Sequence, residues 1–138
     1  MELTHSSHPD FTLPASMRMK SKKSFDLLFE KGKRHWVSPF EAIALEVPFD
    51  ESKPLQVGFV APKRKLKRAH HRNRMKRLMR ESFRLNKNEL LNTCLMQRKG
   101  LMVLFISQCN STVEYPKTQE KIKLLLQRLT LEHAQTAG

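Results

Sequence analysis

A dense group of basic side chains lies in the middle of the chain, between residues 63 and 80. Ten Lys or Arg residues occur there without a single Asp or Glu. Ten like charges repel one another, so the folded chain alone gains little from them, whereas a bound polyanion would neutralise them. These basic residues are Lys63, Arg64, Lys65, Lys67, Arg68, Arg72, Arg74, Lys76, Arg77 and Arg80.

The second half of this group lies on an amphipathic pattern that predicts a helix over residues 72–88. The apolar side is formed at helical spacing by Met75, Leu78, Met79 and Phe83. At about 100° per residue, the opposite side carries Asn73, Lys76, Arg77, Arg80, Arg84 and Lys87. A solvated helix usually mixes acids with bases, so the missing acids favour a phosphate-binding surface over a merely solvated one.

The residues that a protein nuclease needs are not grouped in this sequence. The 13 acidic residues are scattered and none clusters with a His. His70 and His71 are adjacent, so on a helix they do not converge on one ligand. The four glycines are isolated and no zinc-ligand spacing occurs, so neither a phosphate-cradling loop nor a zinc site is indicated. We therefore expect no catalytic residue and no metal held by the protein.

The composition is that of a basic, nucleic-acid-binding protein, although charge alone leaves open a basic protein without such a ligand. The net charge is +13 and the isoelectric point is near 10.2. A length of 138 residues fits one domain with a modest core. Residues 1–16 lack the apolar stretch of a signal peptide, and no run is long enough to span a membrane. A cytoplasmic protein with free thiols at Cys94 and Cys109 is expected.

The elements that must position the basic helix form one α+β domain. We expect a helix over residues 21–32, strands over 36–47 and 55–61, the basic helix over 72–88, a strand over 101–106 and a helix over 117–133. Residues 88–100 give no clear pattern. The predicted domain covers residues 18–133, between a flexible tail over residues 1–17 and a short tail over residues 134–138.

An ordered set of motifs resembles the protein subunit of bacterial ribonuclease P. The tripeptide Arg72-Asn73-Arg74 opens a helix like the signature helix of that family, after a strand that ends in a basic turn at residues 57–64. The other matches are Phe25, Phe29 and Gly32 upstream, Phe40 in the next strand, the apolar run 101–106, and Tyr115 before the last helix. The resemblance covers residues 18–132. Two departures are a connector over residues 63–71 without the usual Gly, and Ile43 where many members carry Tyr.

The resemblance implies an αβββαβα fold, with a four-stranded sheet and three helices in a two-layer sandwich. It implies that catalysis resides in an RNA subunit and that Mg²⁺ is held mainly by RNA. The protein would dock on the ribonuclease P RNA through residues 63–68 and 72–84, without binding DNA or a membrane. Its cleft between the first helix and the sheet would hold the 5′ leader of precursor tRNA. The aromatic residues in or near this cleft would be Phe25, Phe29 and Phe40. For each of them the alternative is plain packing in the core.

Three other functions are weighed against this interpretation. A ribosomal or RNA-chaperone protein could use the same basic helix, but it does not need aromatic residues around a groove. A DNA-binding regulator of the helix-turn-helix class is disfavoured, because a strand and Pro62 precede the connector where that motif has a helix. A self-sufficient protein nuclease is disfavoured by the scattered acids.

Overall fold

The structure, a computed structural model, describes residues 13–135. The bounds of its elements are η1 (Ala15–Met17, a 3₁₀ helix), α2 (Lys22–Lys31), β1 (Lys33–Val37), β2 (Phe40–Val47), β3 (Leu55–Val60), α3 (Ala69–Asn86), α4 (Asn88–Gln97), β4 (Gly100–Ser107) and α5 (Tyr115–Gln135). None of the helices in this range combines the length and apolar character that crossing a bilayer requires.

The four strands form one mixed sheet in the order β1-β2-β4-β3. β1 and β2 form an antiparallel hairpin, β2 is antiparallel to β4, and β3 is parallel to β4. Because parallel strands need a crossover connection, α3 and α4 lie between β3 and β4 in the sequence. All eight residues of β4 are buried, which explains the continuous apolar run at residues 101–106.

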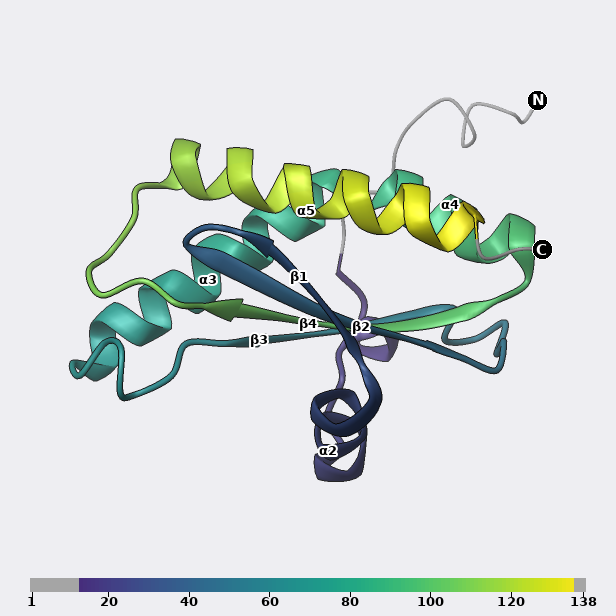
Figure 1. The fold of residues 1–138 in the computed structure, drawn as a ribbon, viewed down its shortest axis with the longest axis horizontal. Helices are drawn as coiled ribbons and strands as arrows, with labels where there is room; N and C mark the ends of the chain where they lie inside the picture. The colour runs from purple at the N-terminus through teal and green to yellow at the C-terminus, as the bar shows by residue number, and fades with distance from the viewer. Residues whose placement is uncertain (1–12, 136–138) are drawn as a thin grey trace.

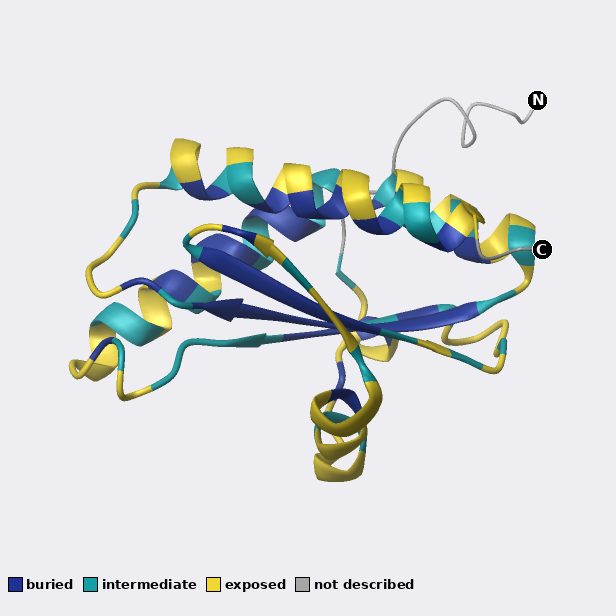
Figure 2. Cartoon of the chain, viewed as in Figure 1, coloured by how far each residue is buried: buried dark blue, intermediate teal, exposed yellow. Residues whose placement is uncertain are grey.

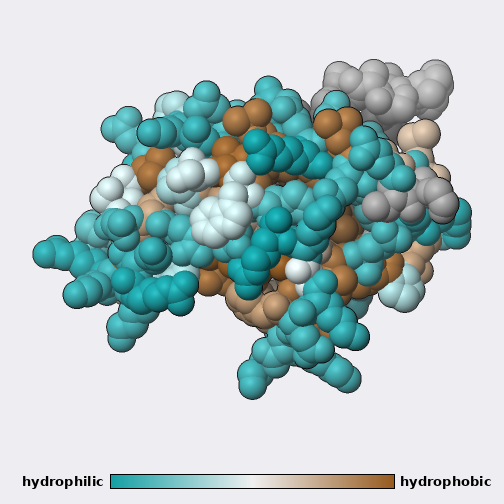
Figure 3. Space-filling view, viewed as in Figure 1, coloured by the Kyte–Doolittle hydropathy of each residue, from teal (hydrophilic) through white to brown (hydrophobic). Residues whose placement is uncertain are grey.

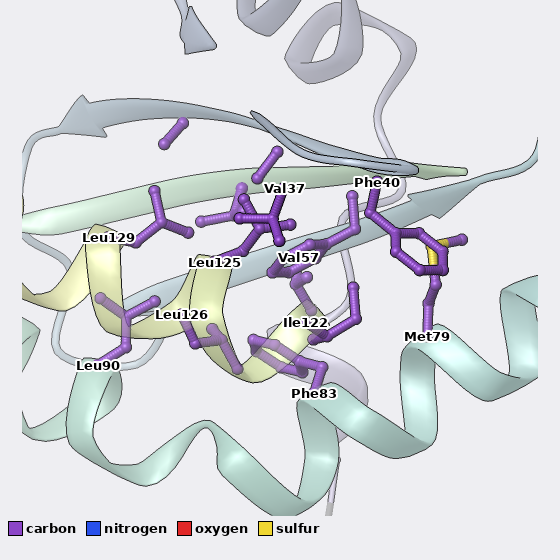
Figure 4. Packing of buried hydrophobic residues seen from close by; sticks show 14 of the residues in the cluster. Val37, Phe40, Val57, Met79, Phe83, Leu90, Ile122, Leu125, Leu126 and Leu129 are labelled. Carbon is purple, nitrogen blue, oxygen red and sulfur yellow. The ribbon is translucent and has the colours of Figure 1, made fainter. Parts of the chain in front are cut away.

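Helices lie on both faces of this sheet. Figure 1 shows α3, α4 and α5 on one face and the short helix α2 on the other. The main core fills the space between the sheet and α3 with α5, and it contains Phe40, Val57, Phe83 and Ile122 (Figure 4). A smaller core lies under α2, where Leu28 packs with Ile43 and Leu104. We call these the α3/α5 face and the α2 face.

Helix α2 begins and ends as its sequence predicts, except at one torsion angle. The Ser21 side chain accepts a hydrogen bond from the backbone N–H of Lys23 at 3.1 Å, which caps the first turn. Gly32 ends the helix with φ of −72°, so the left-handed turn expected there is absent. Glycine is needed for space instead, because a Cβ at position 32 would collide with the Ile43 side chain and the Leu28 carbonyl.

The α+β class, the four-stranded sheet and the final helix are confirmed, and four details of the expected fold are corrected. Residues 36–47 belong to two strands joined at Ser38-Pro39. Residues 88–97 form a helix, α4, so the described residues contain four helices longer than one turn instead of three. Because α2 covers the second face, the arrangement is not a two-layer sandwich. The basic helix α3 begins at Ala69, three residues earlier than expected.

The ends of the domain also differ from the expected boundaries. Met17 is buried in the main core, and the Met19 N–H donates to the Val57 carbonyl at 2.9 Å, so residues 15–19 pack along the outer edge of β3. The part of the expected N-terminal tail that the structure describes is therefore ordered at Met17. Helix α5 continues to Gln135, two residues past the expected boundary. Residues 1–12 and 136–138 lie outside the described residues.

Candidate RNA-binding surface

The connector between β3 and α3 is a tight basic turn with one apolar anchor. The Pro62 carbonyl accepts hydrogen bonds from the N–H groups of Lys65 and Leu66, at 3.1 and 3.2 Å. Leu66 is buried in the main core, whereas most of the cationic side chains around it remain in solvent. The anchor thus holds the turn against the core while it presents the charges outward.

Arg72 fixes this connector to the start of α3. One of its terminal nitrogens, Nη1, donates to the carbonyls of Leu66 and Lys67 at 2.9 and 2.7 Å. Arg72 was predicted only as an RNA ligand. These hydrogen bonds show that Arg72 also positions the connector. They fix the backbone path over residues 63–71, which the sequence did not predict. Substitution of Arg72 would therefore disturb the fold of the connector as well as any phosphate contact.

The solvent side of α3 carries the predicted basic residues, and its core side is the predicted apolar one. Met75, Leu78, Met79, Ser82 and Phe83 are buried. We define the basic surface as the predicted cationic and amide residues of the connector and α3. Its exposed members are Lys63, Arg64, Lys67, Arg68, Asn73, Arg74 and Arg77, and its half-buried members are Lys65, Arg72, Lys76, Arg80 and Arg84. Figure 3 shows hydrophilic residues gathered where this end of the molecule lies in Figure 1.

The basic surface ends where acids reappear in the sequence. The guanidinium of Arg84 binds both carboxylate oxygens of Glu81, at 3.1 and 2.8 Å, and this hydrogen bonding lowers the pKa of Glu81. Lys87, which the helical wheel placed among the basic residues, is buried instead, because α3 ends at Asn86 and the chain turns into α4. Arg84 is therefore partly neutralised, and the uncompensated charge lies in the connector and the first turns of α3.

A small hollow joins α3 to α2 across the outer edge of β3. It measures about 200 Å³ and is lined by Arg18, Met19, Phe25, Val57, Gly58, Phe59 and Arg80. The Arg80 guanidinium carbon lies 5.7 Å from the centre of the Phe59 ring, within cation–π range. A Cβ at Gly58 would lie 3.0 Å from Phe25, so glycine at this position lets the Phe25 ring approach the strand. The structure thus brings together Phe25 and Arg80, which were predicted for separate sites.

The other two predicted aromatic residues differ in accessibility. Phe29 is 48% exposed, one helical turn after Phe25, and the Arg34 guanidinium carbon lies 5.9 Å from its ring centre. Phe40 is fully buried on the α3/α5 face, where it packs near Met79 (Figure 4). The prediction that Phe40 lines the leader cleft is therefore wrong. As the first residue of β2, it points to the face opposite α2.

A larger hollow of about 620 Å³ lies at the start of α2 and was missed in the sequence. Three cations, Arg18, Lys20 and Lys53, line it together with one acid, Asp50, and with Ser16, Ser21 and Ser24. Residues 18–23 contain four basic residues and no acid, a signal that was overlooked because Lys53 joins them only in the fold. Arg18 lines both hollows, so cationic side chains continue beyond the basic surface, along the β3 edge from α3 to α2.

The acidic, histidine and cysteine side chains of the described residues are the ones that could form a metal-binding group or a reactive thiol. In residues 13–135, no three His, Cys, Asp or Glu side chains are grouped so that they could hold a metal ion. Cys94 and Cys109 are both buried, and burial raises the pKa of the Cys94 thiol to about 12, so neither is poised as a nucleophile. The arrangement of cationic and aromatic side chains described above can bind and orient an anionic polymer.

The chain is similar to known proteins in sequence and in fold. A sequence profile of the family described as Ribonuclease P matches residues 13–130. The Ribonuclease P protein component of Photorhabdus laumondii subsp. laumondii is 39% identical over 93 residues, which cover 66% of this chain and 76% of that protein.

Two solved structures from Staphylococcus aureus have a similar fold. One is an RNase P protein mutant with defective mRNA degradation activity, with a TM-score of 0.65 over 82% of this chain and 87% of that chain. The other is the RNase P protein, with a TM-score of 0.54 over 88% and 98% of the two chains. Each is 19% identical to this chain. On the sequence matches, the chain belongs to the ribonuclease P family, the protein components of a tRNA-processing endoribonuclease that is a ribonucleoprotein.

Proposed function

We propose that the basic surface docks on the catalytic RNA of ribonuclease P and that the α2 face binds the 5′ leader of precursor tRNA. The observation that carries the first half is the acid-free stretch between residues 63 and 80, whose exposed members the fold presents together on the connector and α3. Phosphate groups would neutralise these charges and release counterions, which favours association at low salt. Guanidinium groups such as those of Arg74 and Arg77 can form paired hydrogen bonds with phosphate.

The leader-binding half rests on the aromatic residues that α2 presents beside the sheet. Phe25 lies over Gly58 on β3, and Phe29 lies beside Arg34 on β1. Both rings are at least partly accessible, and arginine side chains flank them. Single-stranded RNA is bound in this way by many proteins, since every base has a face that can stack on an aromatic ring. Little sequence preference is expected, which suits leaders of varied sequence.

In this proposal the protein supplies binding, and the RNA supplies the chemistry. Mg²⁺ would be held mainly by RNA phosphates, which suits an ion that keeps most of its waters and prefers oxygen ligands. The cations of the basic surface would offset repulsion between RNA phosphates and so lower the Mg²⁺ concentration needed for activity. Contacts with the leader would favour precursor tRNA over mature tRNA, which lacks it.

The proposal is tested by cleavage of a 5′-extended precursor tRNA with the cognate ribonuclease P RNA at low Mg²⁺. Addition of the protein should restore cleavage at the mature 5′ end, and the protein without the RNA should be inactive. RNA binding without any change in cleavage would favour a ribosomal or RNA-chaperone protein instead. Cleavage by the protein alone would contradict the assignment of catalysis to RNA.

A further inference from the structure

We propose that Trp36, with Arg34, forms a stacking site for single-stranded RNA at the β1 edge of the sheet. The inference rests on the proposed function and extends it to two residues for which the sequence predicted no role. Trp36 is 52% exposed. Side chains alternate between the two faces of the sheet along β1. Lys33 and His35 both bind Glu132 of α5, so they lie on the α3/α5 face, and Arg34 and Trp36 therefore lie on the α2 face.

Strand register places Trp36 beside the row of residues that α2 covers. The row Gly58, Leu104, Ile43 and Arg34 crosses all four strands. Phe25 packs on its β3 end and Phe29 contacts its β1 end. The next row on the same face is Val60, Ile106, Glu41 and Trp36. On β1, Trp36 is therefore the next residue after Arg34 that faces the α2 side. The rise of two strand residues separates their backbones by about 7 Å.

Arg34 is held in place by the buried carboxylate of Glu41. Glu41 is only 1% exposed, and it accepts hydrogen bonds from Arg34 at 2.7 Å and from the Gln108 side chain at 3.2 Å. Because this pair satisfies the carboxylate, Glu41 does not present a free negative charge to an approaching phosphate. The Arg34 side chain is still half exposed, and its guanidinium is thereby fixed near the Phe29 ring, two residues before Trp36 on the same strand.

The backbone at Trp36 is also fixed, although β1 is an edge strand. The Arg128 side chain of α5 donates to the Trp36 carbonyl at 2.8 Å, which satisfies an acceptor that no neighbouring strand can reach. A rigid strand carrying an exposed indole loses little conformational entropy when a base stacks on it. The features of the site are thus an exposed aromatic face, an adjacent guanidinium and a fixed backbone.

The chemistry of the surroundings selects single-stranded RNA as the partner. Lys31 at the end of α2 and Arg128 of α5 lie next to this edge and are cationic, whereas the charge of Lys33 is paired with Glu132 on the other face. An apolar protein partner would instead need a continuous apolar patch, whereas here a charged guanidinium lies beside the Phe29 ring. Alternating aromatic and cationic groups are the pattern that bases and phosphates of a single strand fit.

The experiment uses the intrinsic fluorescence of the full chain, because Trp36 is its one tryptophan. A short single-stranded oligoribonucleotide should quench this fluorescence to saturation, since a stacked base quenches indole. A duplex of equal charge at the same salt concentration should bind with much weaker quenching. Saturable binding of the single strand without a change in Trp36 fluorescence overturns the proposal, and so does equal quenching by the duplex.

Variants provide the second measurement. Trp36→Ala should lower the affinity for the oligomer by roughly tenfold, the equivalent of the ~1.4 kcal/mol that one stacked base contributes, and Trp36→Phe should restore most of it. Leu131→Ala, at an exposed apolar position on α5, is the matched control and should have no effect. If Phe29→Ala weakens binding and Trp36→Ala does not, this inference fails and the proposed leader site stands. If neither substitution weakens binding, both fail.

Discussion

The two faces of the sheet differ in how completely helices cover them. On the α3/α5 face, Phe40, Phe83 and Phe105 are fully buried between the strands and two long helices. On the α2 face, a helix of ten residues covers only part of the sheet, and Phe29 and Trp36 remain about half exposed. Figure 2 shows the same contrast, with buried residues above the sheet and mostly exposed ones on α2. Aromatic residues therefore stabilise the fold on one face and are available to a ligand on the other.

The largest expected effect is on the free energy of unfolding, which an aromatic substitution should lower much more on the α3/α5 face than on the α2 face. Phe83→Ala should lower the free energy of unfolding by about 3–5 kcal/mol, because it removes a ring packed against Phe59 and Phe105. Phe29→Ala, the matched change on the α2 face, should alter it by no more than about 0.5 kcal/mol. Urea unfolding of both variants measures the difference. Equal losses would show that Phe29 is a core residue and would remove the contrast between the faces.

The next effect is on ligand binding by the α2 face. In the reconstituted ribonucleoprotein, Phe29→Ala should weaken the binding of leader-containing precursor tRNA by about 1–3 kcal/mol, because one stacked base is lost. Its affinity for mature tRNA should not change. A filter-binding titration of the two substrates makes the comparison. A similar loss for mature tRNA would mean that Phe29 acts through the fold or the RNA subunit.

A smaller effect is expected at single positions of the basic surface. Arg74→Ala should reduce the slope of log affinity for ribonuclease P RNA against log salt by about 0.7–0.9, which corresponds to one phosphate contact. Arg74 is a cleaner probe than Arg72, whose guanidinium also binds the Leu66 and Lys67 carbonyls. Lys123→Ala on the outer side of α5 serves as the control. A slope that is the same for Arg74→Ala and wild type would exclude Arg74 from the interface.

The smallest effect concerns pH. Desolvation, together with the charges of His70, Arg68 and Arg74, lowers the pKa of His71 in the free protein. A bound phosphate would raise this pKa, so the complex would take up a proton and affinity would increase as pH falls from 8 toward 6. If the pKa of His71 rises by one unit on binding, the gain in RNA affinity should stay below about tenfold. His71→Gln should abolish this dependence on pH. NMR titration of His71 with and without RNA measures the shift directly, and identical curves would contradict the prediction.

Local patterns predicted the parts of this fold that local physics decides. The spacing of Met75, Leu78, Met79 and Phe83 identified the buried side of α3, and the run 101–106 identified the central strand. Helix α4 was missed because it buries only Leu90 and Cys94 and ends at Arg98 in a left-handed conformation, without the glycine that usually marks such an end.

Contacts between distant segments set what the sequence could not predict. Which face Phe40 occupies depends on the register of β2 with β1 and β4, and a shift of one residue would reverse it. The larger basic hollow needs Lys53 from the turn before β3 beside Arg18 and Lys20. The positions of Arg34 and Trp36 likewise depend on Glu41 and Arg128, which lie 7 and 92 residues away from their respective partners.

The most direct test of the central claim is the ratio of affinities for precursor and mature tRNA, measured with the ribonucleoprotein at low Mg²⁺. The account predicts that wild-type protein favours the precursor and that the double substitution Phe25→Ala with Phe29→Ala brings the ratio close to that of the RNA alone. The double variant should still dock on the RNA, because the basic surface is intact. A ratio that stays at the wild-type value would contradict the assignment of leader binding to the α2 face.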